Sequence, residues 1–319
     1  MHTLARSSFL LLLATLSAFA QQPQKPKAGE MNTDDMWVAK VVPKALAPHI
    51  THHSYHSEAM QREVGYSLYL PPGYDKETAF RYPVIYHLHG AGGNELRAIN
   101  SAQVLNAGIT AGRLPEIIMV FPNGGRSTMY QDSADRRFLA ETTFIKELIP
   151  HIDSSYRTIP ERRGRCIEGF SMGGRGSVHL AMKHPTLFCS LFDQAGNVFP
   201  VASMPKDTPA DAYPFSYLGN DPARLQDNDS YLNLHKNLDQ IKGGLRIQIA
   251  CGTRDPEHLP TVRQFHEELV KSGIDHTYLE LENLGHNQNL MIDRLKPVWF
   301  DYHVESLKRA GVELHLLKK

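Results

Sequence analysis

The chain has few cysteines, and this scarcity excludes one class of protein. Only Cys166, Cys189 and Cys251 occur among the 319 residues. Their odd number leaves at least one thiol unpaired unless it bonds to another chain. Because three cysteines can form at most one disulfide within the chain, a small scaffold held by several disulfides is excluded. Because each lies in an apolar run, we expect three buried small side chains rather than a cysteine nucleophile.

The chain also lacks net charge, with 34 basic and 34 acidic residues and a formal charge of +0. Nucleic acids and anionic membranes attract proteins that carry an excess of lysine and arginine. This balance therefore gives no electrostatic case for either partner.

The apolar run at the N-terminus is too short to span a bilayer. Arg6 precedes the run, which covers residues 9–16, and Ala18-Phe19-Ala20 follows as a cleavage signature. We therefore predict a signal peptide over residues 1–20, with an uncleaved anchor as the alternative. The mature protein would be secreted or periplasmic and would have no membrane span. Residues 21–50, which begin rich in Pro, Lys and Gln, are predicted to be a flexible segment.

The remaining residues, 51–319, alternate between two hydrophobic periods. Strands are predicted near 64–70, 84–88, 117–121, 165–168, 187–192, 245–250 and 277–281, and helices near 135–156, 172–184, 261–271 and 290–307. This alternation predicts one α/β domain with a mostly parallel central sheet flanked by helices. Residues 195–244 break the pattern. The sequence favours two interpretations equally, a substrate-binding insertion or a surface connection with a short helix at 231–241.

A G-x-S-x-G sequence, Gly169-Phe170-Ser171-Met172-Gly173, joins a predicted strand to a predicted helix. This context is typical of the nucleophile elbow of the α/β-hydrolase fold, where a tight turn exposes the serine hydroxyl. Serine is a weak nucleophile, so Ser171 needs a base and an oxyanion site elsewhere in the chain.

An acid and a histidine follow later strands in the order that this fold uses. Asp255 comes directly after the 245–250 strand, and His286 follows the last strand. We predict that His286 accepts the proton of Ser171 and that Asp255 orients the imidazole. Asp193 is the second choice of acid, and Asp275 lies at the wrong end of its strand. The rival histidines are His258, which could support Asp255 from the same loop, and His266 and His276, which read as structural or surface residues.

The oxyanion site is predicted to consist of two backbone N–H groups, those of Met172 and Ala91. Ala91 lies in a glycine-rich loop over residues 89–93, and no Gly-Lys-Ser/Thr follows that would indicate a phosphate loop. His52, His53 and His56 precede the first predicted strand without a cysteine or carboxylate to complete a set, so no metal site is predicted there.

Taken together, these motifs resemble an esterase family of α/β-hydrolases. That family includes bacterial feruloyl and acetyl-xylan esterases, S-formylglutathione hydrolases and mycobacterial mycolyltransferases. The resemblance runs from about Ser54 to Leu307, and its carriers are 70–74, 87–93, 122–124, 147–150, 169–174 and 284–286. It implies carboxylic-ester hydrolysis through an acyl-serine intermediate without metal or cofactor. Glu168 departs from the small or apolar residue usual before the elbow.

Within the family, the leader argues against the cytosolic S-formylglutathione hydrolases and favours removal of feruloyl or acetyl groups from carbohydrate esters. Gly90 is expected to line the substrate site, and an aromatic wall could come from Tyr130, Phe199, Tyr213, Phe215 and Tyr217. Three alternatives stay open: hydrolysis of a siderophore or other ester, acyl transfer, and a non-catalytic binding module on the same scaffold.

Overall fold

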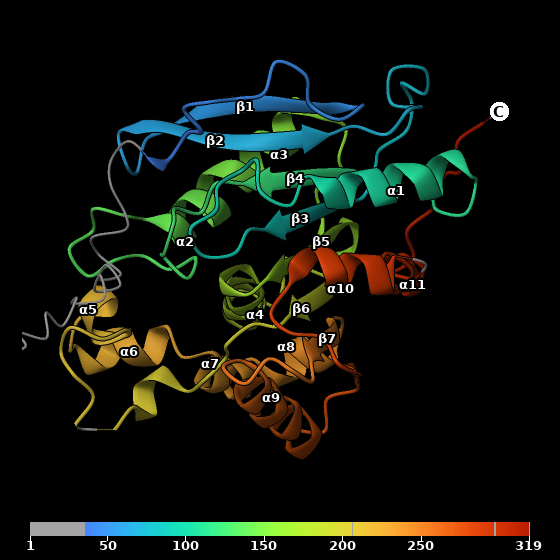
Figure 1. Cartoon of the computed structure of the whole chain (residues 1–319). Coiled ribbons are helices and arrows are strands. Elements are labelled where there is room, and N and C mark those ends of the chain that lie inside the picture. Colours follow the sequence, from blue (N-terminus) through green and yellow to red (C-terminus); the bar gives the residue numbers. More distant parts are fainter. Residues whose placement is uncertain (1–35, 206, 297, 319) are drawn as a thin grey trace, which may run out of the picture.

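The computed structural model describes residues 36–205, 207–296 and 298–318. Its framework is an eight-stranded sheet with the order β1-β2-β4-β3-β5-β6-β7-β8 (Figure 1). The strands are β1 Ile50–Ser57, β2 Arg62–Tyr69, β3 Val84–Leu88, β4 Ile118–Pro122, β5 Arg165–Phe170, β6 Ser190–Gln194, β7 Arg246–Gly252 and β8 His276–Leu281.

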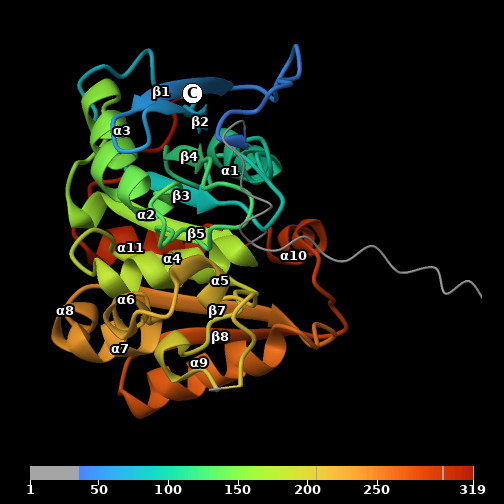
Figure 2. The same cartoon turned by 90° about the vertical axis from the view of Figure 1, so that its left-hand side faces the viewer.

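The sheet is parallel from β4 through β3 to β8, while β1 and β2 join it as an antiparallel pair at one edge. Every residue of β3, β4, β5 and β6 is buried, because helices cover both faces of a parallel sheet. The predicted fold class, an α/β-hydrolase with a mostly parallel sheet, is therefore confirmed. Figure 2 shows the arrows of β3 and β7 pointing toward the same edge of the sheet.

The main helices are α1 Asn100–Thr110, α4 Met172–Lys183, α9 Leu259–Lys271, α10 Gln288–Leu295 and α11 Asp301–Arg309. A composite helix consists of α2 Ala140–Thr142, the π-helical turn Thr143–Leu148 and α3 Ile149–Ser155. Figure 1 shows α1, α10 and α11 on one side of the sheet and α4 on the other. The single closing helix predicted over 290–307 is wrong, since α10 and α11 are separate; the sequence has Pro297 between them, which lacks the N–H that a continuous helix needs.

Residues 195–244 contain four short helices, α5 Phe215–Leu218, α6 Pro222–Asp227, α7 Ser230–Lys236 and α8 Leu238–Lys242, and a 3₁₀ turn at Val201–Ser203. Another 3₁₀ turn, Arg162–Gly164, precedes β5. The helix predicted at 231–241 corresponds to α7 and α8. The role of this region as a substrate-binding insertion stays a prediction.

The predicted signal peptide and most of the segment predicted to be flexible lie outside the described residues. From the later part of that segment, Trp37 is 1% exposed and stacks on Phe138 with ring centroids 6.2 Å apart. This indole is therefore part of the core. No helix within the described ranges is long and apolar enough to cross a membrane.

Candidate active site

Ser171 occupies a strained turn between β5 and α4. Its φ of 59° and ψ of −118° fall outside the regions that L-residues favour. Two glycines permit the turn: a Cβ at Gly173 would lie 2.0 Å from the carbonyl oxygen of Leu88, and one at Gly169 would lie 2.4 Å from that of Gly173. The predicted elbow geometry is thus present, and Ser171 remains accessible above α4.

The structure brings Ser171, His286 and Asp255 into one hydrogen-bonded chain. The Oγ of Ser171 lies 2.9 Å from Nε2 of His286, and Nδ1 of His286 lies 2.5 Å from Oδ2 of Asp255. Ser171, Asp255 and His286 follow β5, β7 and β8, so the carboxyl ends of three parallel strands supply them. Asp255 is buried, and the hydrogen bond that its carboxylate accepts holds the proton on Nδ1, which leaves Nε2 as the acceptor.

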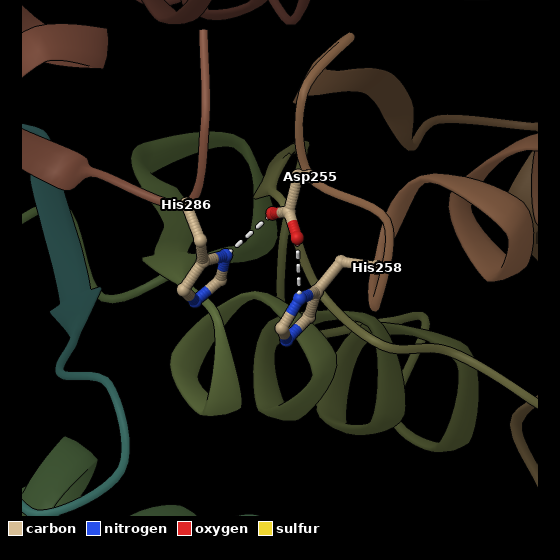
Figure 3. Close-up of side chains that lie close together, drawn as sticks. All are labelled: Asp255, His258 and His286. Carbon is tan, nitrogen blue, oxygen red and sulfur yellow. Dashed lines mark hydrogen bonds and ion pairs between the residues drawn. The ribbon is translucent and has the colours of Figure 1, made fainter.

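A second imidazole completes the surroundings of Asp255 (Figure 3). Nδ1 of His258 lies 2.9 Å from Oδ1 of Asp255, so the two histidines occupy the two carboxylate oxygens. Their rings stack with centroids 3.9 Å apart and planes 11° from parallel. Phe170 contacts His286 as well, at a centroid distance of 4.6 Å.

These neighbours lower the pKa of His286 from its ordinary value of 6.5. Burial is the main cause and His258 adds to it, while the hydrogen bond to Asp255 opposes the shift. The imidazole is therefore neutral at pH 7 and can accept a proton.

Of the rival residues, His258 supports Asp255 as described, and the others lie elsewhere. Asp193, predicted to follow a strand, lies inside β6, where its Oδ1 accepts from the N–H of Gly196 at 2.9 Å. Burial raises the pKa of Asp193 to about 7, and no hydrogen bond joins its carboxyl to a histidine among the described residues. His266 and His276 bond to each other at 2.7 Å, and Asp275 precedes β8 at its amino end.

The glycine-rich loop after β3 is held by His89. Nε2 of this buried ring accepts from the N–H of Gly124 at 3.1 Å, so Nδ1 carries the proton and donates to the carbonyl of Gly90 at 2.9 Å. Burial lowers the pKa of His89 to about 4, which keeps the ring neutral. Among the described residues, the N–H groups of Ala91 and Met172 have no hydrogen-bond partner, as a role as oxyanion donors requires.

A cleft of about 730 Å³ opens beside Ser171 and His286. Its lining includes Gly90, whose contact with substrate stays a prediction, together with Ala91, Leu96, Arg97, Ala98, Ile99, Asn100, Phe170, Asn287, Gln288 and Asn289. Its polar side chains are mostly amides and one guanidinium, which the sequence analysis missed. Asn287, Gln288 and Asn289 directly follow His286, so their position after the strand was the available signal.

The predicted aromatic wall does not line this cleft. Tyr130 is 0% exposed and its hydroxyl accepts from the N–H of His89 at 2.9 Å, while Tyr217 is 3% exposed and donates to the carbonyl of Gln131. Phe199 packs under the guanidinium of Arg175, 4.1 Å from its ring centroid. The prediction that these aromatic residues form a wall of the substrate site is therefore wrong. Tyr130 and Tyr217 belong to the core because their hydroxyls form hydrogen bonds with buried partners there.

The unusual Glu168 has a structural explanation. It is fully buried in β5, and its carboxylate accepts from Nδ1 of His87 at 2.6 Å, Nε2 of His303 at 3.1 Å and Nε1 of Trp299 at 3.1 Å. His87 in turn meets the side-chain amide of Gln288 at 3.0 Å, next to the cleft. A charged residue is tolerated directly before the elbow because three donors surround it.

Two further predictions concern residues away from the cleft, namely three histidines and three cysteines. His52, His53 and His56 do not precede the first strand but lie on β1, an edge strand whose polar alternation concealed it. They have separate surroundings: His52 bonds to Glu95 at 2.9 Å, His53 stacks on Tyr66 and His56 lies 3.4 Å from Glu63. The three cysteines are free and buried, as predicted.

The fold, the elbow and the Ser–His–Asp arrangement define an α/β-hydrolase. The chain belongs to the esterase family whose sequence model, described as "Putative esterase", matches residues 57–290.

Curated relatives share part of the sequence. An esterase of Mycobacterium tuberculosis is 31% identical over 154 residues, which cover 47% of this chain and 32% of that protein. An endo-1,4-beta-xylanase/feruloyl esterase of Xylanibacter ruminicola is 29% identical over 144 residues, covering 42% of this chain and 20% of that protein. The match thus spans about a third or less of the length of these relatives.

Solved structures share the fold. A ferulic acid esterase superposes with a TM-score of 0.65 at 21% identity, covering 82% of this chain and 98% of the other. An S-formylglutathione hydrolase from Agrobacterium tumefaciens also gives 0.65, at 20% identity, covering 81% and 95%. At these identities the superpositions support the architecture.

Proposed function

We propose that the protein is a secreted carboxylic-ester hydrolase that works through an acyl-serine intermediate on feruloyl or acetyl esters of carbohydrates. The observation that carries this proposal is the continuous hydrogen-bonded chain from Ser171 through His286 to Asp255. Membership of the esterase family supports the reaction class.

In the first half of the reaction, His286 takes the proton of Ser171 as Oγ attacks the ester carbonyl carbon. The carbonyl oxygen gains negative charge, and the N–H groups of Ala91 and Met172 are free to donate to it. Asp255 stabilises the imidazolium that forms. Collapse of the tetrahedral intermediate breaks the ester C–O bond, and His286 returns its proton to the departing alcohol.

In the second half, His286 removes a proton from water, which attacks the acyl-serine carbonyl. The same backbone N–H groups hold the second oxyanion, and the proton then returns to Oγ of Ser171 as the acid leaves. His286 thus acts as base and then as acid in each half, and Ser171, which is the nucleophile in the first half, is the leaving group in the second.

The composition of the cleft supports a carbohydrate alcohol. Hydroxyl groups need both donors and acceptors, and the amides of Asn100, Asn287 and Asn289 offer both. Feruloyl as the acyl group is suggested by the names of a relative and of neighbouring structures. Secretion is suggested by the leader sequence over residues 1–20.

The test is labelling with a fluorophosphonate followed by peptide mass spectrometry, with hydrolysis of p-nitrophenyl acetate and methyl ferulate measured beside it. We expect one adduct on Ser171, turnover of both esters, and a loss of at least ~10³-fold in kcat/KM for Ser171→Ala. Absence of both adduct and turnover would favour the binding-module alternative. The ratio of the two rates tests the acyl group, and N-terminal sequencing of exported protein tests cleavage after Ala20.

A further inference from the structure

Arg97 carries the formal charge in the cleft beside Ser171. Among the described residues that line this cleft, there is no second lysine or arginine and no carboxylate. The side chain of Arg97 is exposed, and no hydrogen bond or ion pair joins its guanidinium to another described residue. The guanidinium is therefore available to a group that enters the cleft from solvent.

The carboxylates closest to the cleft walls are already occupied. Glu95, two residues before Arg97, is buried and accepts from the ring of His52 at 2.9 Å and from the side-chain amide of Asn123 at 2.6 Å. Asp255 accepts from two histidines. The helices α1 and α10, which begin at the cleft, have no acidic residue in their first turns. The described part of the chain thus supplies no carboxylate for Arg97.

A second guanidinium lies against the same glycine-rich loop. The carbonyl of Arg126 accepts from the N–H of Gly92 at 2.7 Å, and its Nη2 is 4.0 Å from the position that a Cβ on Gly92 would take. Its Nε is buried without a hydrogen-bond partner. The Cβ of Arg97 lies 3.2 Å from the corresponding position at Gly93. Two cations without carboxylate partners among the described residues therefore adjoin the loop that contains Ala91.

We propose that the alcohol part of the ester substrate carries a carboxylate, as a uronic acid unit of an acidic carbohydrate does, and that Arg97 binds this carboxylate. Arg126 adds attraction at longer range. A planar guanidinium suits this role because it can donate two parallel hydrogen bonds to one carboxylate. This inference rests on the proposed esterase function and narrows its class of substrate.

The position of the alcohol part follows from His286. In the proposed reaction, Nε2 of His286 returns the proton to the departing alcohol, so the alcohol oxygen must lie beside this ring. His286 lines the same cleft as Arg97, together with the amides of Asn287 and Asn289. A carbohydrate that leaves on this side can therefore place its hydroxyls on the amides and its carboxylate on the guanidinium.

The experiment compares two substrates that differ in this charge. They are the monoacetyl esters of methyl glucoside and methyl glucuronoside, acetylated on the same hydroxyl, in which a carboxylate replaces the primary alcohol. We expect the wild-type kcat/KM to be at least about tenfold higher for the uronoside at low ionic strength, and this ratio to fall to about one in Arg97→Gln. Added NaCl should lower the ratio of the wild type but not that of the variant, because salt screens the charge pair.

Arg113→Gln is the matched control. Arg113 lies on α1 and is 41% exposed, but it pairs with Asp301 at 2.5 Å and does not line the cleft. Its replacement should leave the ratio at the wild-type value, and Arg126→Gln should lower the ratio less than Arg97→Gln does. The proposal is overturned if the wild type does not prefer the uronoside, if Arg97→Gln keeps the preference, if Arg113→Gln loses it equally, or if Arg126→Gln has the larger effect.

A binding measurement separates this site from the esterase function. Titration of Ser171→Ala with methyl glucuronoside, followed by NMR of the ligand, gives a Kd without hydrolysis. We expect this Kd to be at least about tenfold higher when Arg97→Gln is added, with no such change for methyl glucoside. Equal Kd values would refute the carboxylate site even if the wild type hydrolyses esters. The expected Kd values in a protein whose wild type turns over no ester would uphold the site and refute the proposed function alone.

Discussion

Glu168 is the buried charge on which the stability of the central sheet should depend most. Its carboxylate accepts three hydrogen bonds, from His87, His303 and Trp299, and none of these side chains has access to water at that point. The replacement Glu168→Leu keeps a similar volume but leaves three donors without an acceptor.

The magnitude follows from the cost of those unpaired groups. Each buried donor that loses its partner costs about 1–3 kcal/mol, so three cost roughly 3–9 kcal/mol. Since a typical domain is stable by about 5–15 kcal/mol, Glu168→Leu should be close to unfolded at 25 °C. Replacing an exposed carboxylate should cost far less: Glu305 is half exposed and pairs with Arg309 at 3.0 Å, where solvent screens the interaction.

The assay is urea unfolding followed by tryptophan fluorescence, with Glu305→Leu as the matched control. Glu168→Leu should lower the free energy of unfolding by at least about 3 kcal/mol or yield no folded protein, whereas Glu305→Leu should unfold at nearly the same urea concentration as wild type. If Glu168→Leu behaves like the control, the three hydrogen bonds do not contribute as argued.

The pH dependence gives a second check on the same carboxyl. The hydrogen bonds from His303 and His87 and their charges outweigh burial and lower the pKa of Glu168 from 4.5 to about 2. A lowered pKa stabilises the folded state above pH 4.5, and this contribution is lost as the pH falls toward 2. The stability gap between wild type and the more conservative Glu168→Gln should therefore narrow between pH 5 and pH 2.5, and a gap that widens would contradict the assignment.

Three further predictions concern the active site. Asp255→Asn should lower kcat by about 10⁴-fold, whereas folded Asp193→Asn should keep kcat within about tenfold of wild type. If steady-state kinetics show the larger loss of kcat in Asp193→Asn, the catalytic acid is Asp193 instead. Because neutral His286 accepts the proton and its pKa is lowered from 6.5, the acid limb of the kcat/KM profile should have its midpoint below pH 6.5, and a midpoint above it would contradict the shift. Gly173→Ala places a Cβ 2.0 Å from the carbonyl oxygen of Leu88, so soluble yield and fluorophosphonate labelling should both fall sharply; normal values for both would mean that the elbow can relax.

Sequence spacing was sufficient to predict which residues meet at the elbow. Ser171, Asp255 and His286 each follow a parallel strand, and the carboxyl ends of such strands meet at one edge of the sheet whatever the side chains between them. The backbone connectivity alone therefore brings them together. The same reasoning separated Asp275, at the amino end of β8, from the site.

Elements whose apolar residues do not follow a clear period were missed. Most side chains of β1 are exposed or half-exposed, including those of His52, His53 and His56. Its sequence therefore shows only a weak alternation of apolar and polar residues. α1 contains Gly108 and several polar residues, and its helical period is faint. Both depend on tertiary packing against β2 and the sheet more than on local preference.

The prediction of an aromatic wall failed for a different reason, and His258, which was predicted to support Asp255 from the same loop, shows the contrast. An aromatic residue in a polar loop gives no indication whether its hydroxyl will find a partner in the core, as that of Tyr130 does on the N–H of His89. His258, in contrast, lies three residues after Asp255 in a turn where its N–H bonds the carbonyl of Asp255 at 3.3 Å, and this backbone contact returns the imidazole to the carboxylate. When a histidine follows the catalytic acid by three residues in such a turn, the turn geometry predicts a contact between the two side chains. The position of an aromatic ring, in contrast, depends on packing that the local sequence does not encode.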